Sequence, residues 1–179
     1  MDQLVFREVD ATRWSDLARL FNAPGGPSYC WCTVWRELPS AARSSAKAKR
    51  EAMQQRVQDG VPVGILGYRD GEPVAWCSIA PKETYRSALG GPQEDGDSVW
   101  SLVCFFLHRR LRGEGVGRQL LAAAVDHARS KGATVLEAYP VDRQSPSYRF
   151  MGFVPMFQAA GFREVGLAGS RRHVMRLAL

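Results

Sequence analysis

Hydrophobic and polar positions follow their clearest pattern between residues 99 and 139. Val99–Leu107 is an almost continuous run of apolar, aromatic and β-branched residues, which is typical of a strand covered on both faces. Over residues 116–128 the apolar side chains fall on one helical stripe, and Gly132 is a typical helix stop. Thr134–Tyr139 then has the pattern of a second strand. This order predicts a strand–helix–strand crossover between parallel neighbours.

Shorter strand-like runs and helical stripes fill the rest of the chain. Asp70-Gly71 lies between two such runs and is a strong hairpin signal. The expected elements are a strand at 4–9, a helix at 12–21, a helix from Ser40 or Ser44 to Gly60, strands at 61–68 and 73–80, a polar loop at 81–97, a short helix at 156–160 and a closing hairpin of 161–165 with 172–177.

The turn into the central helix carries three glycines at alternate positions. Gly113, Gly115 and Gly117 lie between Arg112 and Arg118. Glycine lets the backbone approach a ligand closely, and the first N–H groups of a helix have no partner within it. This pattern indicates a site for a phosphate or pyrophosphate group. The alternative is an ordinary glycine-rich turn with solvated arginines, which three alternate glycines between two arginines disfavour.

Two common phosphate-binding patterns do not match this loop. The P-loop string Gly-x-x-x-x-Gly-Lys-Ser/Thr is absent from the sequence. The dinucleotide fingerprint requires a third glycine where Arg118 stands, although Glu137 lies about 20 residues on, where that fold places its ribose-binding acid. That fold also requires repeated strand–helix alternation, and the sequence predicts only one crossover.

A third pattern, Arg-x-x-Gly-x-Gly after a central strand, is matched by residues 112–117. It closely resembles the coenzyme A pyrophosphate loop of the GNAT superfamily of acyltransferases. The order of expected elements resembles the GNAT order over essentially the whole chain, and Ala160-Gly161-Phe162 resembles the family's turn into its sixth strand. The resemblance implies one α+β domain over residues 1–179, with mixed αβα layers. Its central mixed, mostly antiparallel sheet would contain one βαβ crossover that carries this loop.

The same resemblance implies acetyl-coenzyme A as the cofactor. In the family, two central parallel strands splay and pantetheine lies between them, which would set the thioester beside Leu107. A backbone N–H near the end of that strand would then polarise the thioester carbonyl. The positions expected to hold the pyrophosphate are Arg112, Gly113, Gly115, Val116, Gly117 and Arg118.

The chain departs from the family at the expected acid. Members commonly have a tyrosine four residues before the glycine of the Ala-Gly-Phe turn, where this chain has Phe157, and an asparagine about seven residues earlier, where it has Phe150. Tyr148 or Tyr139 is a candidate replacement, and both also suit packing. Glu137 is a candidate base, with exposure to water as the alternative. Because a thiol has a pKa near ~8.5, the thiolate is a fair leaving group even without an acid.

Aromatic and thiol side chains gather between the first two expected helices. In the GNAT arrangement this segment overhangs the acceptor side of the thioester. Tyr29, Trp31, Cys32 and Trp35 are therefore expected to form the wall of an acceptor pocket, or a cage for a cationic amine. The alternative is that the two tryptophans, one helical turn apart, seal the core.

The four cysteines do not predict a disulfide or metal framework. Cys30 and Cys32 are too close for a relaxed disulfide with each other, and no cysteine or histidine spacing suits a metal. Cys77 and Cys104 lie in apolar runs and are expected to be small buried hydrophobes. Since no neighbour in sequence lowers a cysteine pKa, direct acyl transfer is favoured over an acyl-cysteine intermediate.

The net charge of +6 and the pI near 9.5 fit a polyanionic cofactor. They also permit nucleic-acid binding, but the basic residues form only short pairs, so that interpretation is the weaker one. No run of ~18 apolar residues or basic-plus-apolar leader is present, so no membrane span is predicted and a cytoplasmic location is expected.

These observations predict an N-acetyltransferase that moves an acetyl group from acetyl-coenzyme A to a primary amine of a small molecule or peptide. Direct attack by the amine is expected, in a monomer or a homodimer without a metal. The main alternative is a catalytically degenerate domain that binds an acyl-coenzyme A and regulates a partner.

Overall fold

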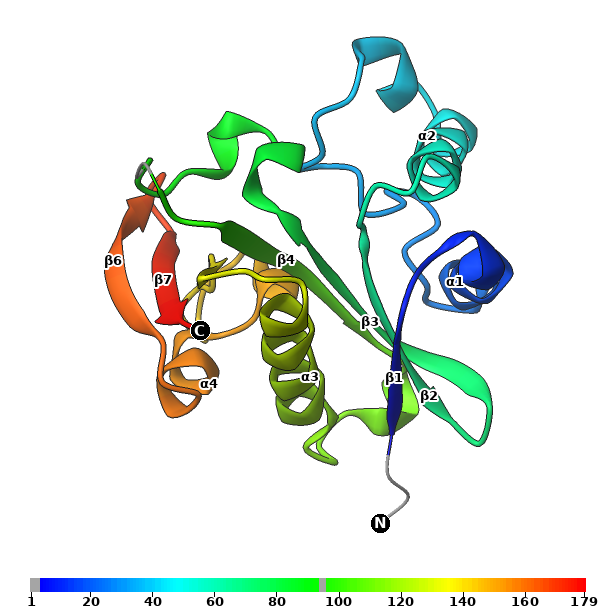
Figure 1. The fold of residues 1–179 in the computed structure, drawn as a ribbon. Helices are drawn as coiled ribbons and strands as arrows, with labels where there is room; N and C mark the ends of the chain where they lie inside the picture. The colour runs from blue at the N-terminus through cyan, green and yellow to red at the C-terminus, as the bar shows by residue number, and fades with distance from the viewer. Residues whose placement is uncertain (1–3, 94–95) are drawn as a thin grey trace.

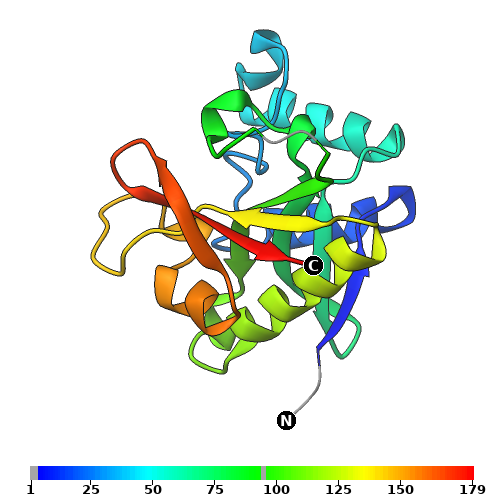
Figure 2. The same ribbon diagram turned by 60° about the vertical axis from the view of Figure 1, so that its left-hand side comes forward.

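The structure, a computed structural model, describes residues 4–93 and 96–179. Its centre is a seven-stranded sheet with the order β1-β2-β3-β4-β5-β7-β6. Helices α1 and α2 cover one face of the sheet, and α3 and α4 cover the other (Figure 1). The hairpin of β6 and β7 forms one edge, where the chain ends (Figure 2). Among the described residues, no helix is long and apolar enough to cross a membrane.

The observed elements follow the expected order. They are β1 (Val5–Glu8), α1 (Trp14–Asn22), α2 (Ala46–Gln58), β2 (Gly64–Arg69), β3 (Glu72–Pro81), β4 (Val99–Leu107), α3 (Val116–Ser130), β5 (Val135–Ala138), α4 (Val154–Ala159), β6 (Arg163–Ala168) and β7 (Arg172–Ala178). The expected loop at 81–97 contains two short 3-10 helices, η3 (Lys82–Thr84) and η4 (Ser87–Leu89), and its residues 94 and 95 lie outside the described part.

The predicted crossover is confirmed. Strands β4 and β5 pair in parallel through α3, whereas the other strand pairs in the described sheet are antiparallel. The buried stripe of α3 matches the sequence pattern, because its spacing places every third or fourth residue on the sheet. The residues of that stripe are Val116, Leu120, Leu121, Ala124 and Ala128.

The parallel pairing is short, and this shapes the centre of the molecule. It runs only from Val99 opposite Val135 to Leu102 opposite Ala138, although β4 continues to Leu107. Beyond Ala138 no described strand pairs with this side of β4. On the other side, the register shifts between Leu102 and Cys104, so a β-bulge marks the point where the two strands part.

Trp31 belongs to the core between α1, α2 and the sheet. Its side chain is 2% exposed and stacks on Trp14 at 5.8 Å between ring centroids. The ring centroid of Phe21 lies 5.3 Å from that of the same indole. Trp31 therefore seals the core, although through a turn with a φ of 49° rather than through the helical spacing considered from the sequence.

Replacing Trp31 tests this packing role. We expect Trp31→Ala to lower the free energy of unfolding by about 3–5 kcal/mol, because it removes a buried aromatic side chain and leaves a cavity. Urea denaturation measures the change. The control is Tyr29→Ala, whose side chain is 73% exposed and should change stability by less than about 0.5 kcal/mol. An unchanged unfolding midpoint in Trp31→Ala would contradict the assignment to the core.

Candidate cofactor and acceptor site

The loop before α3 has the backbone that its glycines allow. Gly113 has a φ of 86°, and Gly115 has a φ of 76° at the residue that precedes the helix. Both values lie in the left-handed region, where glycine has no steric penalty. A Cβ built at either position would meet no atom within 4 Å, so this side of the loop is open.

Several backbone N–H groups of the open loop have no hydrogen-bond acceptor among the described residues. Among the described residues, no hydrogen bond accounts for the N–H groups of Gly113, Gly115, Val116 and Gly117. Val116 is buried and fixes the start of the helix against the sheet. Free N–H groups at a helix N-terminus bind anions, since the helix dipole adds to their partial positive charge. The loop therefore fits a pyrophosphate.

The charged side chains around the loop favour an anion. Arg112 and Arg118 are exposed on either side of it, and no ion pair engages them among the described residues. Glu114, the loop's one acidic side chain, pairs with Arg69 of the β2–β3 hairpin at 2.9 Å. This pair reduces the net repulsion that the Glu114 carboxylate would exert on a bound phosphate.

The glycine loop before α3 lies directly beside the splayed end of β4. A Cβ built on Gly117 would lie 3.9 Å from Leu107 Cδ1 and 3.8 Å from Met156 Sδ of α4. Leu107 is the last residue of β4 and is partly exposed. The structure thus brings the predicted pyrophosphate loop and Leu107 together at one end of the gap between β4 and β5.

A cavity of about 170 Å³ lies beside the splayed half of β4. Its lining is mostly apolar and aromatic, and it comes from the turns after α1, from the splayed half of β4 and from Phe150. The lining residues are Pro27, Tyr29, Cys30, Cys32, Val34, Trp35, Val103, Cys104, Phe105, Phe106 and Phe150. Three of the four predicted acceptor residues are among them, and Trp31, in the core, is not.

The aromatic rings of Trp35 and Tyr148 already contact a cationic side chain of the protein, Arg172. The guanidinium of Arg172 lies 4.4 Å from the ring centroid of Trp35 and 5.5 Å from that of Tyr148. It also donates hydrogen bonds to the backbone oxygens of Leu89 and Ala88. The expected cage for a cationic amine is therefore filled at Trp35 by Arg172, a contact between segments that are far apart in the chain.

Tyr148 and Phe157 occupy very different environments. Tyr148 is 36% exposed, has a φ of 59° and lies against the rings of Trp35 and Phe150, which both line the cavity. No hydrogen bond of its hydroxyl is found in the described part of the chain. Phe157 is completely buried between Phe105 and Phe162, so it packs the core rather than facing the cavity.

Glu137 is buried and fully engaged, which contradicts both sequence expectations for it. Its carboxylate is 0% exposed and pairs with Lys82 and Arg176, each at 2.7 Å. The hydroxyl of Tyr139 donates to it at 2.6 Å. A carboxylate held by two cations cannot readily take a proton from an amine, and it does not face water. Burial and the Glu137 charge raise the pKa of Tyr139 far above its usual range, so Tyr139 is not a suitable acid either.

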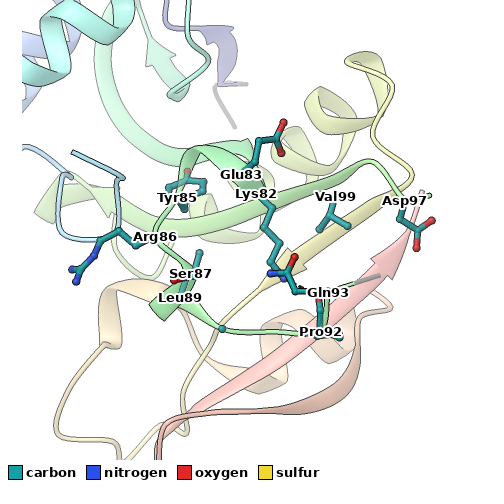
Figure 3. Close-up of a pocket in the computed structure, with 11 residues that line it drawn as sticks. Lys82, Glu83, Tyr85, Arg86, Ser87, Leu89, Pro92, Gln93, Asp97 and Val99 are labelled. Carbon is teal, nitrogen blue, oxygen red and sulfur yellow. Dashed lines mark hydrogen bonds between the residues drawn. The ribbon is translucent and has the colours of Figure 1, made fainter. Parts of the chain in front are cut away.

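The Glu137 network fastens the loop after β3 to the sheet. Figure 3 shows Lys82 in the surface pocket formed by that loop, pointing toward Pro92 and Gln93. The ammonium of Lys82 reaches both the Pro92 carbonyl at 3.0 Å and Glu137. Because this ammonium is already paired, the pocket does not offer a free charge to a ligand.

The thiols in the acceptor cavity have unequal acidities. A hydrogen bond from the Cys104 thiol, together with the charge of Arg36, lowers the pKa of Cys32 to about 6. Burial raises the pKa of Cys30, and the Cys32 thiolate and burial raise that of Cys104. The sequence analysis considered only neighbours along the chain, whereas the largest cause of the lowered pKa of Cys32 is Cys104, on a distant strand. The expectation that Cys104 is simply a core residue is wrong.

Comparison with known proteins agrees with the fold. A sequence model of the acetyltransferase (GNAT) family matches residues 26–153. The chain therefore belongs to the GNAT acetyltransferase family. Comparison with curated protein sequences finds no match.

Solved structures share the fold over nearly the whole chain. AAC(6')-Ib in complex with ribostamycin and coenzyme A has a TM-score of 0.64 and 18% identity, over 99% of this chain and 94% of that one. Ribosomal-protein-alanine N-acetyltransferase from Brucella melitensis has a TM-score of 0.59 and 21% identity, over 98% and 100%. YncA from Salmonella typhimurium, solved with acetyl-coenzyme A, has a TM-score of 0.56 and 17% identity, over 98% and 94%.

The role of Glu137 can be tested by removing its charge. We expect Glu137→Gln to lower the free energy of unfolding by about 3–5 kcal/mol, because two nearly buried cations lose their anion. Chemical denaturation measures this loss. The control is Glu114→Gln, which removes an exposed pair and should cost less than about 1 kcal/mol. Unchanged stability of Glu137→Gln together with a lost activity would restore Glu137 as a base.

Proposed function

We propose that this protein is an N-acetyltransferase that moves an acetyl group from acetyl-coenzyme A to a primary amine by direct attack. The observation that carries the proposal is the set of free N–H groups at Gly113–Gly117 beside the splayed end of β4. Family membership and the coenzyme A complexes of structural neighbours support it. The proposed acceptor is an amine of a small molecule or a peptide. One structural neighbour is solved with ribostamycin, and another is a ribosomal-protein-alanine N-acetyltransferase.

The residues present fit the cofactor. The backbone of Gly113, Gly115, Val116 and Gly117 would hold the pyrophosphate, with Arg112 and Arg118 supplying charge. When bound, acetyl-coenzyme A supplies an acetyl group that is activated as a thioester. The unpaired side of β4 between Val103 and Leu107 offers backbone donors to polarise a carbonyl.

The acceptor cavity favours the reactive form of an amine. No carboxylate lines it within the described residues, so water rather than a side-chain base accepts the proton. An apolar lining disfavours a charged ammonium more than a neutral amine, which lowers the pKa of the bound amine. The cavity therefore selects the neutral nucleophile. Tyr148, exposed beside Trp35, is the candidate acid for the departing thiolate.

Phe157 favours a second candidate function. It stands where the family commonly has an acidic hydroxyl, and it is buried in the core. A member without an acid could bind an acyl-coenzyme A and regulate a partner instead of turning it over. The two functions differ in whether free thiol appears when an amine is added.

The cofactor loop is tested by a pair of matched glycine substitutions. We expect Gly115→Val to weaken coenzyme A binding by at least about tenfold, ~1.4 kcal/mol, because the side chain fills the open side of the loop. Isothermal calorimetry measures the affinity. Gly132→Val is the control, since Gly132 has a similar φ of 81° and an open surrounding at the opposite end of α3. It imposes the same backbone strain but should leave the affinity unchanged. Equal affinities in all three proteins would contradict the proposed site.

The reaction is tested by thiol release from acetyl-coenzyme A with a panel of amines. We expect release that depends on at least one amine, and we expect Tyr148→Phe to lower the turnover by about 10²-fold if Tyr148 donates the proton. Coenzyme A affinity should stay the same in this variant. Binding of the cofactor without any amine-dependent thiol release would favour the regulatory function. A silent Tyr148→Phe would show that the thiolate leaves without this acid.

A further inference from the structure

Two cysteines from distant parts of the chain meet in the wall of the acceptor cavity. Cys32 comes from the turns after α1, and Cys104 comes from the bulged part of β4. Both are half-buried free thiols that line the same cavity, and the neighbouring Cys104 thiol is the largest cause of the lowered pKa of Cys32. The indole N–H of Trp76 also donates to Cys32 Sγ, at 3.5 Å. The neighbouring groups of Cys104 and Trp76 therefore stabilise the thiolate form of Cys32.

A buried cation without a carboxylate partner lies behind this pair. Arg36 is 0% exposed, and its guanidinium donates to the Val63 carbonyl at 2.6 Å and to Ser78 Oγ at 2.8 Å. Its Nε and Nη1 have no hydrogen-bond partner in the described part of the chain, and no ion pair engages it there. A buried cation is costly unless an anion balances it. Its guanidinium lies 4.6 Å from the ring centroid of Tyr85, and its charge favours the ionised forms of Cys32, Tyr85 and Cys77.

The backbone at Cys32 is held in an uncommon conformation. Trp31 and Cys32 have φ values of 49° and 55°, which non-glycine residues rarely adopt. The buried indole of Trp31 keeps this turn in place and so holds the thiol of Cys32 toward the cavity. Strained backbone that the surrounding packing enforces is a common feature of functional sites.

We propose that Cys32 is a site of reversible oxidation by hydroperoxides, with Cys104 as the thiol that resolves it into a disulfide. Low-pKa thiols that are accessible and lie next to a second thiol are the ones that react in this way. Cys30 lines the same cavity, but its pKa is raised, so it should remain reduced. The oxidation itself does not depend on the proposed function, and only its expected effect on acetyl transfer rests on that function.

The chemistry balances in two steps. The Cys32 thiolate attacks a peroxide oxygen, an S–O bond forms, the O–O bond breaks, and hydroxide leaves and is protonated to water. Cys32 is oxidised to a sulfenic acid and hydrogen peroxide is reduced. Cys104 then attacks the Cys32 sulfur, an S–S bond forms, the S–O bond breaks, and a second water leaves.

The disulfide would change the wall of the acceptor cavity, whereas the pyrophosphate loop lies outside that cavity. It would tie the turn at Cys32 to β4 across the wall of the cavity, where the acceptor amine is expected. The loop at Gly113–Gly117 lies before α3 and shares no lining residue with this cavity. Oxidation should therefore raise KM for the amine by a larger factor than it weakens coenzyme A binding.

The test treats the protein with hydrogen peroxide and measures intact mass and cross-linked peptides. We expect the wild type and the matched control Cys30→Ser to lose two hydrogens, with Cys32 joined to Cys104, and dithiothreitol to reverse the change. In Cys104→Ser we expect a sulfenic acid at Cys32 that dimedone traps. In Cys32→Ser we expect no reaction at the same dose. These readouts need no acetyl transfer, so they remain valid if the proposed function fails.

A second measurement covers the case in which Cys32→Ser does not fold. Iodoacetamide alkylation of the wild-type protein, mapped by peptide, should follow a pH profile for Cys32 with a midpoint near pH 6, well below that of Cys30. Preferential oxidation or alkylation of Cys30 would overturn the proposal. So would an acetyl group carried on Cys32 after treatment with acetyl-coenzyme A alone, because Cys32 would then serve acyl transfer.

Discussion

The early end of the parallel pairing between β4 and β5 is the constraint on which the rest of the site depends. Pairing stops at Leu102 and Ala138, although β4 runs on to Leu107, so one side of a central strand is left without a partner. Unpaired backbone groups in the middle of a sheet are costly unless something else satisfies them. Here they face the gap that begins at the glycine loop, and a cofactor that fills this gap would satisfy them.

Buried polar contacts hold the two strands together just before they part. Glu137 on β5 pairs with Lys82 and Arg176, and Tyr139 links it to Ser101 on β4 through a hydrogen bond of 2.7 Å. This network fixes the closed end of the gap, while the free N–H groups of the loop mark its open end. A rigid closed end and an open anion site give the gap a defined direction, and the acceptor cavity lies beside the splayed half of β4.

The sequence predicted the fold and the glycine-rich turn into α3 because local patterns encode both. The apolar run of Val99–Leu107, the stripe of α3 and the alternate glycines each depend on residues that are close in the chain. Glu137 and Cys104 were misjudged because their environments come from distant segments. Lys82 and Arg176 reach Glu137 from other strands and loops, and the fold brings Cys104 and Cys32 into the wall of one cavity. Periodicity in a single sequence carries no trace of such contacts.

The central claim is that the gap between β4 and β5 holds the cofactor, and a crystal structure with coenzyme A tests it most directly. We expect density for the pyrophosphate on the N–H groups of Gly113–Gly117, and density for the pantetheine arm along the unpaired side of β4 toward Val103. Coenzyme A bound at another surface, with β4 and β5 unchanged and the loop empty, would contradict the account.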